Sequence, residues 1–403
     1  MLARLRPNLD FMPSPVPDRP GLVIRDPFHY SDATLIIPPA LVPSLEFFDG
    51  ERSATDLRAC LVQITGDLDV SALMQHLEET LSTAGFLEDG NYARLRETAE
   101  RTFAEASQRE PAHAGSGYPG EAAELTETFT GYLNGGESKT DDRRTLAIAA
   151  PHVSPFGGVE SYRAAYASLS PGDGERTFVI LGTSHYGQPD RLGLTRKPFA
   201  TPFGETVTDA SLVDRLASEA GDGVLMEDYC HSVEHSIEFQ VVFLQHLFGP
   251  RIRILPILCG SYARSLYYGG MPEDDERVRR TLGALGEVAA KEGDRLLWVL
   301  GVDMAHMGRR YSDAFDAKAG QDQMEEVARR DRTRIERMEQ GDARGFWSRV
   351  QENRDDLKWC GSAPIYTFLK VAPAAQGSLL HYQQWNIDER SVVSFAGLKF
   401  HSR

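Results

Sequence analysis

Short apolar runs alternate with longer amphipathic stretches over most of the chain, from about residue 112 to the end. Runs rich in Val, Ile, Leu and Ala predict strands at Leu146–Ala149, Phe178–Leu181, Ile252–Ile257, Leu296–Leu300 and Val392–Leu398. The amphipathic stretches between them include Asp209–Ala220 and Asp274–Glu292, which predict helices. Strands that are apolar throughout are typical of a sheet covered on both faces. We therefore predict an α/β fold, in which helices flank both faces of a twisted, mainly parallel sheet.

The N-terminal part of the chain has a different order of elements. Over residues 20–91 the pattern predicts two short strands, two helices and a closing hairpin or wing, at Leu22–Arg25, Thr34–Ile37, Ser53–Val62, Val70–Ala84 and Phe86–Gly90. Ser53 is a suitable N-cap for the first helix, and Asp56 stands at the capping-box position. These elements predict a small α+β domain.

Two weakly patterned segments set the domain boundaries. Residues 1–19 are rich in proline and lack periodicity, so we expect a tail that lies over the surface or is disordered. Residues 92–107 are charged and carry no strong apolar stripe, so we expect a linker or connecting helix there. The second and larger domain then spans residues 108–403. Two domains are also what the length of 403 residues predicts, because domains of roughly 100–200 residues are usual.

Composition narrows the class of protein. Four cysteines in a chain of this size favour a reducing cytoplasm over a disulfide framework. No stretch approaches the roughly 18 consecutive apolar residues of a membrane span, and no apolar run of a signal peptide follows the basic start. The formal net charge of -16 disfavours nucleic-acid binding, which needs basic residues to neutralise phosphates. We expect a cytoplasmic protein that binds neither nucleic acid nor membrane.

Polar residues follow three of the predicted strands. His152 comes after the first strand, His185 after the second, and Asp303 and His306 after the fourth, each on a turn that contains glycine. Glycine lets the backbone bend sharply, and an α/β sheet usually builds its site at the carboxyl ends of its strands. Imidazole nitrogens suit Fe, Cu, Zn and Ni, and the thiolate of Cys360, on another glycine turn, would complete such a site. Taken singly, each histidine is more often a hydrogen-bonded loop residue, and a lone cysteine is more often a small buried hydrophobe.

A second polar cluster begins an apolar, helical stretch. Glu234 and Glu238 lie four residues apart and share a helix face, with His235 beside them. In a functional interpretation, His235 donates or accepts a proton and Glu234 orients it. In the structural interpretation, which we prefer for Glu238, the acids complement the dipole at a helix N-terminus.

Six stretches of the second domain resemble, in order, the successive motifs of the Memo family. They are AHAGSGYPGEAAELTETFTGYL, APHVSPFGG, LGTSHYG, VEHSIEFQ, GVDMAHMG and WCGSAPI. The segment Ser391–Gly397 also resembles the last strand of that family, so the resemblance covers nearly all of residues 108–403. With a second domain in front, the chain resembles the bacterial group called AmmeMemoRadiSam system protein B. In the first domain, FFDGERSATDL and GFLED resemble the PqqD-like winged-helix domains.

The resemblance implies a metal centre and names its ligands. Memo proteins share their fold with the class III extradiol dioxygenases, which are non-haem iron enzymes. By this resemblance, His152, His185 and Cys360 correspond to the metal ligands. The expected metal is Fe(II), with Cu or Zn as the alternatives.

The resemblance also implies roles for four neighbouring residues. His306 corresponds to the histidine that acts as acid and base in the dioxygenases, and Asp303 to an aspartate of the site. Glu234 and His235 fall on a motif that lines the pocket. His306 would then move a proton, while Asp303 and His235 orient the ligands.

Three classes of function remain open at this point. The first is an oxidative metalloenzyme acting on an unknown small molecule or modified peptide. The second is a carrier or quenching protein that holds iron or copper without turnover. The third is an interaction module that binds a peptide without catalysis. The group resemblance further implies an AMMECR-type protein and a radical-SAM enzyme as partners.

Overall fold

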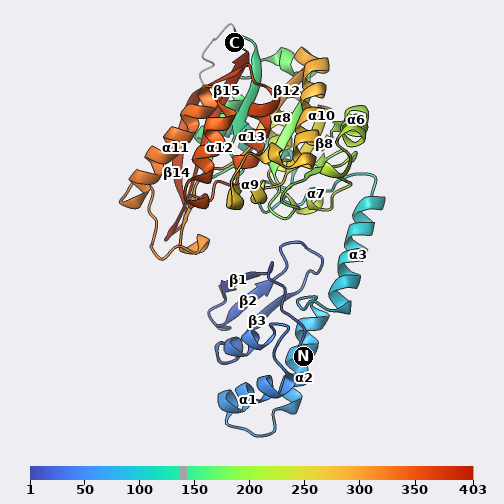
Figure 1. Ribbon diagram of the computed structural model, residues 1–403, viewed down its shortest axis with the longest axis vertical. Coiled ribbons are helices and arrows are strands. Elements are labelled where there is room, and N and C mark those ends of the chain that lie inside the picture. Colours follow the sequence, from blue (N-terminus) through green and yellow to red (C-terminus); the bar gives the residue numbers. More distant parts are fainter. Residues whose placement is uncertain (136–142, 403) are drawn as a thin grey trace. The chain divides into compact units, whose positions relative to one another are not determined.

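The computed structural model (Figure 1) describes residues 1–135 and 143–402. The chain divides into two compact units, which span residues 1–105 and 106–403. The second unit carries all the candidate metal ligands.

The first unit combines a small antiparallel sheet with helices. Three strands pair in the order β1 (Asp10–Pro13), β2 (Leu22–Arg25) and β3 (Thr34–Ile37), followed by a 3-10 helix at Pro39–Phe47 and by α1 (Ala54–Thr65), α2 (Ser71–Thr83) and α3 (Gly90–Glu105). The predicted cap of α1 is confirmed, because the Ser53 side chain accepts from the Asp56 amide and the Asp56 carboxylate accepts from the Ser53 amide. The apolar faces of these elements pack into one core.

Two features of the first unit differ from the expectations. Residues 1–19 are no loose tail, because β1 pairs with β2, and Arg6 is buried in an ion pair with Asp26 at 2.9 Å. Proline content concealed a short edge strand, which needs few ladder hydrogen bonds. Residues 86–90 form a turn into α3 with a single bridge from Leu87 to Leu5, so the predicted wing is absent from this described segment. The winged-helix assignment is therefore not confirmed.

The second unit is built on one large sheet. Within the described ranges, ten of its strands form a mixed, mostly parallel sheet with the order β10-β6-β11-β5-β12-β4-β15-β13, to which β9 and β14 add at β11 and β15. Their bounds are β4 (Thr145–Ala150), β5 (Thr177–Thr183), β6 (Leu192–Leu194), β9 (Val207–Thr208), β10 (Val224–Met226), β11 (Arg253–Cys259), β12 (Leu296–Gly301), β13 (His306–Gly308), β14 (Ala375–Asp388) and β15 (Ser391–Ser402). A separate pair joins β7 (Ala200–Thr201) and β8 (Gly204–Glu205). All five predicted strands are present, as β4, β5, β11, β12 and β15.

Alternating side chains of the central strands enter two different cores. Ala147 and Ala149 of β4 belong to one buried cluster, and Ile148 and Ala150 belong to the other. The helices that contribute to the first cluster are α6 (Ala210–Ala220), α10 (Glu276–Glu292), α11 (Gln323–Glu339), α12 (Ala343–Gln351) and α13 (Ser362–Val371). Those of the second are α4 (Ala122–Leu133), α5 (Val159–Tyr166) and α8 (Glu238–Phe248). The sheet is thus covered on both faces, which explains its strands of continuous apolar residues.

Part of the sheet is antiparallel. β15 pairs antiparallel with β14 on one side and, at different positions along its length, with β4 and β13 on the other. The remaining α-helices of the described residues are the short α7 (Cys230–Val233) and α9 (Ala263–Tyr268). In the part of the chain that the structure describes, no helix is long and apolar enough to cross a membrane.

Candidate metal centre

Three neighbouring strands end at the centre. β12 lies between β4 and β5 and runs parallel to both, so the carboxyl ends of all three strands lie side by side. His152 follows β4, His185 follows β5, and Asp303 follows β12. This is the edge at which a parallel sheet commonly forms its site.

Glycines at the strand ends admit a fourth segment. Gly182 of β5 and Gly301 of β12 are direct neighbours in the sheet. A Cβ atom on Gly182 would lie 2.5 Å from the Ser236 Oγ, and one on Gly301 would lie 2.1 Å from the Ser236 carbonyl oxygen. Only glycine therefore allows the turn between α7 and α8 to lie against the strand ends. Ser236 Oγ donates to the Thr183 carbonyl at 2.8 Å and fixes that turn, which places His235 over the same edge.

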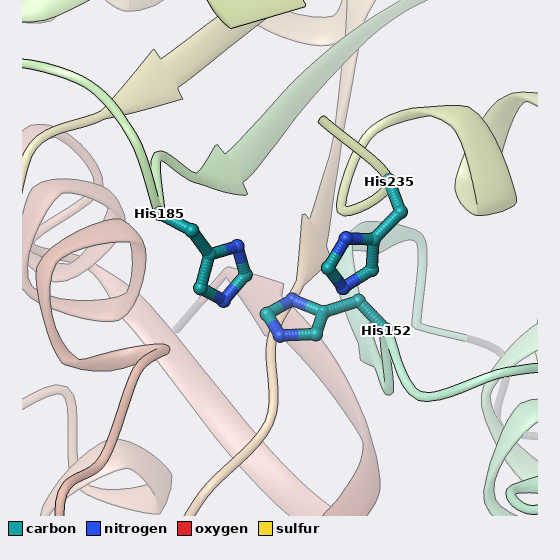
Figure 2. A group of neighbouring side chains, drawn as sticks. All are labelled: His152, His185 and His235. Carbon is teal, nitrogen blue, oxygen red and sulfur yellow. The ribbon is translucent and has the colours of Figure 1, made fainter. Parts of the chain in front are cut away.

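Three imidazole rings face one point (Figure 2). One ring nitrogen each of His152, His185 and His235 lie within 4.8 Å of one another, which is a set that could hold a metal ion. The ring centroids are 5.1 Å apart for His152 and His185, 5.1 Å for His152 and His235, and 5.0 Å for His185 and His235. The three rings come from three separate turns, so no fixed sequence spacing links them.

His152 is buried and oriented by its neighbours. Its Nδ1 lies 2.9 Å from the Gly301 carbonyl oxygen, which can only accept, so Nδ1 carries the proton and Nε2 keeps its lone pair. Its backbone amide donates to Asp303 Oδ1 at 2.9 Å. Burial and the nearby His185 lower the pKa of His152 to about 3, so the ring is neutral. A neutral imidazole with a free Nε2 is the form that binds metals.

Glu234 orients the two other imidazoles. Its carboxylate accepts from the His185 backbone amide at 2.9 Å, from the His185 Nδ1 at 3.0 Å, and from the His235 backbone amide at 2.9 Å. Burial would raise the pKa of Glu234, but the charge and hydrogen bonds of His185 hold it far below its usual value. Burial would lower the pKa of His185, and the Glu234 carboxylate instead raises it well above its usual value. Burial keeps the pKa of His235 well below its usual value.

Cys360 also reaches the cluster. Its Sγ lies 3.2 Å from the His152 Nε2 and 3.7 Å from the Asp303 carbonyl oxygen. Asp303 Oδ2 lies 3.5 Å from the same His152 nitrogen. Burial raises the pKa of Asp303 to about 6 and raises the pKa of the Cys360 thiol, although His185 acts against the second shift. The thiol and the carboxylate therefore face the nitrogen of His152 that is free to bind a metal.

His306 lies close enough to the three-histidine group for its charge to lower the pKa of His152. Its Nδ1 is 2.9 Å from the Met304 carbonyl oxygen and 3.1 Å from the Lys358 carbonyl oxygen, so it carries the proton and leaves Nε2 as an acceptor. The Tyr311 and His306 rings are nearly perpendicular, and their centroids are 4.9 Å apart. Burial lowers the pKa of His306, so the ring is neutral.

The structure brings together all seven residues that the sequence singles out. His152, His185 and Cys360 were expected as ligands, and His235 joins their group rather than lying only in the pocket wall. Sequence reasoning gave no role to His113, whose ring meets that of His235 at 5.6 Å and whose Nε2 donates to the Val233 carbonyl at 3.0 Å. The sequence could have indicated His113, because it lies in the motif AHAGSGYPG, but no residue of that motif received a role. Tyr311 had no signal in the sequence.

Comparison with known proteins shows to which family the second unit is similar. The model of the family described as Memo-like protein matches residues 109–399. A MEMO1 family protein from Aquifex aeolicus is 26% identical over 389 residues, which cover 94% of this chain and 96% of that protein. MEMO1 family proteins from Thermococcus kodakarensis and Pyrococcus furiosus are 30% and 29% identical, and cover 72% and 70% of this chain and 99% and 94% of their own lengths. The chain therefore belongs to the Memo-like protein family.

Proposed function

We propose that this protein binds a metal ion between His152, His185 and His235 and uses it for oxidative chemistry on a small molecule or modified peptide. The convergence of three imidazole nitrogens within 4.8 Å carries the proposal. We assign the Cys360 thiol as a further ligand, and its distance of 3.2 Å from the His152 Nε2 supports this assignment. The metal-centre part rests on this geometry, and the oxidative part on the resemblance to the extradiol dioxygenases.

The donor set fits a transition metal. Imidazole suits Fe, Cu and Zn, and a thiolate adds a soft donor that hard cations such as Mg²⁺ do not favour. The Gly301 carbonyl and the Glu234 carboxylate hold the Nδ1 atoms of His152 and His185, which leaves each Nε2 for a metal. Because the pKa of His185 is raised, a metal would displace the proton on its Nε2. We propose Fe(II) as the metal, with Cu and Zn as alternatives. Bound iron would supply the redox chemistry with O₂ that amino-acid side chains lack.

The surrounding residues have separate tasks. Glu234 holds His185 and His235 in place and offsets positive charge at the centre. Asp303 holds the backbone of His152 through the amide hydrogen bond of 2.9 Å. His306, with a proton on Nδ1 and a lone pair on Nε2, accepts a proton from the substrate and returns it.

Metal analysis of ligand variants tests the metal-centre part. Protein purified without oxygen should contain about one equivalent of metal, and His152→Ala, His185→Ala and His235→Ala should each lose most of it. His76→Ala is the matched control, because His76 is an exposed histidine of α2 in the first unit. Full metal content in all three ligand variants would refute the three-histidine centre. Oxygen consumption by the loaded protein then tests the oxidative part.

A second candidate function is metal transfer without turnover. The soft Cys360 thiol beside the buried His152 favours this candidate, because thiolates bind copper strongly and are easily oxidised. Copper retained through repeated exposure to oxygen, with no oxygen consumed, would support a carrier over an enzyme.

A further inference from the structure

An N-terminal segment of the second unit holds the turn that carries Glu234 and His235. We call residues 109–118 the strap and residues 231–237 the His235 turn. Arg109, at the start of the strap, is fully buried. Its Nε donates to the His231 carbonyl at 2.8 Å, and its Nη2 donates to the Glu234 carbonyl at 2.9 Å. One guanidinium group therefore fixes two backbone carbonyls of the His235 turn.

The charge of Arg109 is matched by Glu238, at the start of α8. Arg109 Nη1 lies 2.5 Å from Glu238 Oε2, and both side chains are fully buried. The same carboxylate accepts from the backbone amides of Ala112 and His113 at 3.2 and 3.0 Å and from the Tyr118 hydroxyl. Burial would raise the pKa of Glu238, but Arg109 holds it below its usual value. Burying an ion pair costs free energy that further hydrogen bonds offset, and here the Glu238 carboxylate accepts three of them.

The strap makes a third contact through His113. Its Nε2 donates to the Val233 carbonyl at 3.0 Å, and its ring edge meets the ring of His235 at 5.6 Å. The carbonyls of residues 231, 233 and 234 are thus all held by the strap. The Glu234 backbone is fixed on one side by Arg109, while its side chain reaches His185 and His235 on the other.

We propose that Arg109 is a positioning residue of the metal centre. It fixes the backbone at Glu234 so that one carboxylate meets both His185 and His235 at hydrogen-bonding distance. None of its polar atoms contacts the three-histidine group directly, so it acts on that group only through the His235 turn. The effect on metal binding rests on the proposed function, whereas the effect on the turn does not.

Arg109→Lys tests the guanidinium geometry while keeping the charge. Lysine can pair with Glu238, but it lacks the planar fork that donates to two carbonyls at once. We expect Arg109→Lys to weaken binding of Co²⁺ and of Zn²⁺ by about 10–100-fold, the usual effect of losing a partner that orients a ligand. The visible spectrum of bound Co²⁺ should also change, because it reports the geometry of the ligands.

Arg176→Lys is the matched control. Arg176 is also buried and paired, with Asp173 at 2.9 Å, and it donates to the carbonyls of Thr145 and Leu296. Those residues begin β4 and β12, at the opposite ends of the strands from the centre. Arg176→Lys should lower the unfolding midpoint and leave the Co²⁺ affinity within twofold of wild type. Equal losses of affinity in the two variants would overturn the positioning role.

Hydrogen exchange of the metal-free protein separates this inference from the proposed function. The amides of His185 and His235 both donate to Glu234, so Arg109→Lys should speed their exchange, whereas Arg176→Lys should not. Wild-type protein that binds neither Co²⁺ nor Zn²⁺ would refute the metal centre, and unchanged exchange in Arg109→Lys would refute the positioning role. If Arg109→Lys does not fold, Tyr118→Phe replaces it, because that variant removes one donor to Glu238. It should speed the exchange of the same amides and weaken Co²⁺ binding, both to a smaller extent.

Discussion

The hydrogen-bond partner of Nδ1 determines which ring nitrogen of a neutral imidazole carries the proton. In His152 and His306 that partner is a backbone carbonyl, which has no proton to give, so both rings keep a lone pair on Nε2. The same tautomer would serve both proposed tasks, because His152 belongs to the three-histidine group and His306 does not. What distinguishes a ligand from a proton carrier is therefore position, which an isolated sequence does not contain.

The His306→Ala variant should separate these two tasks. We expect metal content near wild type, because His306 is outside the group of three histidines that could share an ion. Turnover, once a substrate is known, should fall by about 10²–10⁴-fold, the usual contribution of a general acid or base. Metal content measured beside His152→Ala provides the comparison. Loss of metal in both variants to the same extent would make His306 a ligand.

The candidate residues could be predicted from sequence, but their grouping could not. His152, His185 and Asp303 were found because they follow apolar strands on glycine turns. His235 was expected to transfer protons, because its motif lies before a helix and has no visible relation to the strand ends. The contact arises through Ser236, which fits into a space left by two glycines. Such a fit depends on tertiary packing that residue types alone do not encode.

At the scale of elements, the junction of β5, β12 and the His235 turn determines the geometry of the centre. Gly301→Ala would place a methyl group about where the Ser236 carbonyl oxygen now lies, 2.1 Å from the ideal Cβ position. We expect the variant to lose about 1–3 kcal/mol of unfolding free energy, the usual cost of overpacking, and to bind metal more weakly. Denaturant unfolding and Co²⁺ titration measure the two effects.

Gly283→Ala is the control for that substitution. Gly283 lies in α10 with no atom within 4 Å of an added Cβ, so alanine should stabilise the helix by about 0.5–1 kcal/mol. A Gly301→Ala protein as stable and as metal-competent as wild type would show that the His235 turn adjusts freely.

Sequence analysis missed β14, the longest strand of the large sheet, for a physical reason. β14 spans fourteen residues but is mostly half-buried, and polar residues, three Gln among them, interrupt its sequence, so it lacks the apolar runs of the central strands. Its pairing with β15 and the antiparallel contact of β15 with β4 depend on partners distant in sequence. The five buried strands were predictable because a sheet covered on both faces needs continuous apolar residues. An antiparallel strand with one partly exposed face does not carry that signal.

At the scale of the whole molecule, the two units should be separable. The match to the Thermococcus kodakarensis relative includes 99% of that protein but only 72% of this chain. The family match at residues 109–399 covers a similar share of this chain. We therefore expect residues 106–403 to fold alone and to bind metal with wild-type affinity. Circular dichroism and metal titration against the full chain measure both properties. A fragment that folds but binds no metal would show that the first unit supports the centre.

The strap limits where one protein module can be exchanged for another. Arg109 is four residues beyond the end of the first unit, and the carbonyl of Ala106 already accepts from the Lys197 ammonium at 2.7 Å. A crossover point placed within residues 107–118 would therefore cut through the segment that supports the His235 turn, although the sequence there resembles an ordinary linker. In a chimera, a domain that replaces the first unit should therefore be joined at or before Glu105.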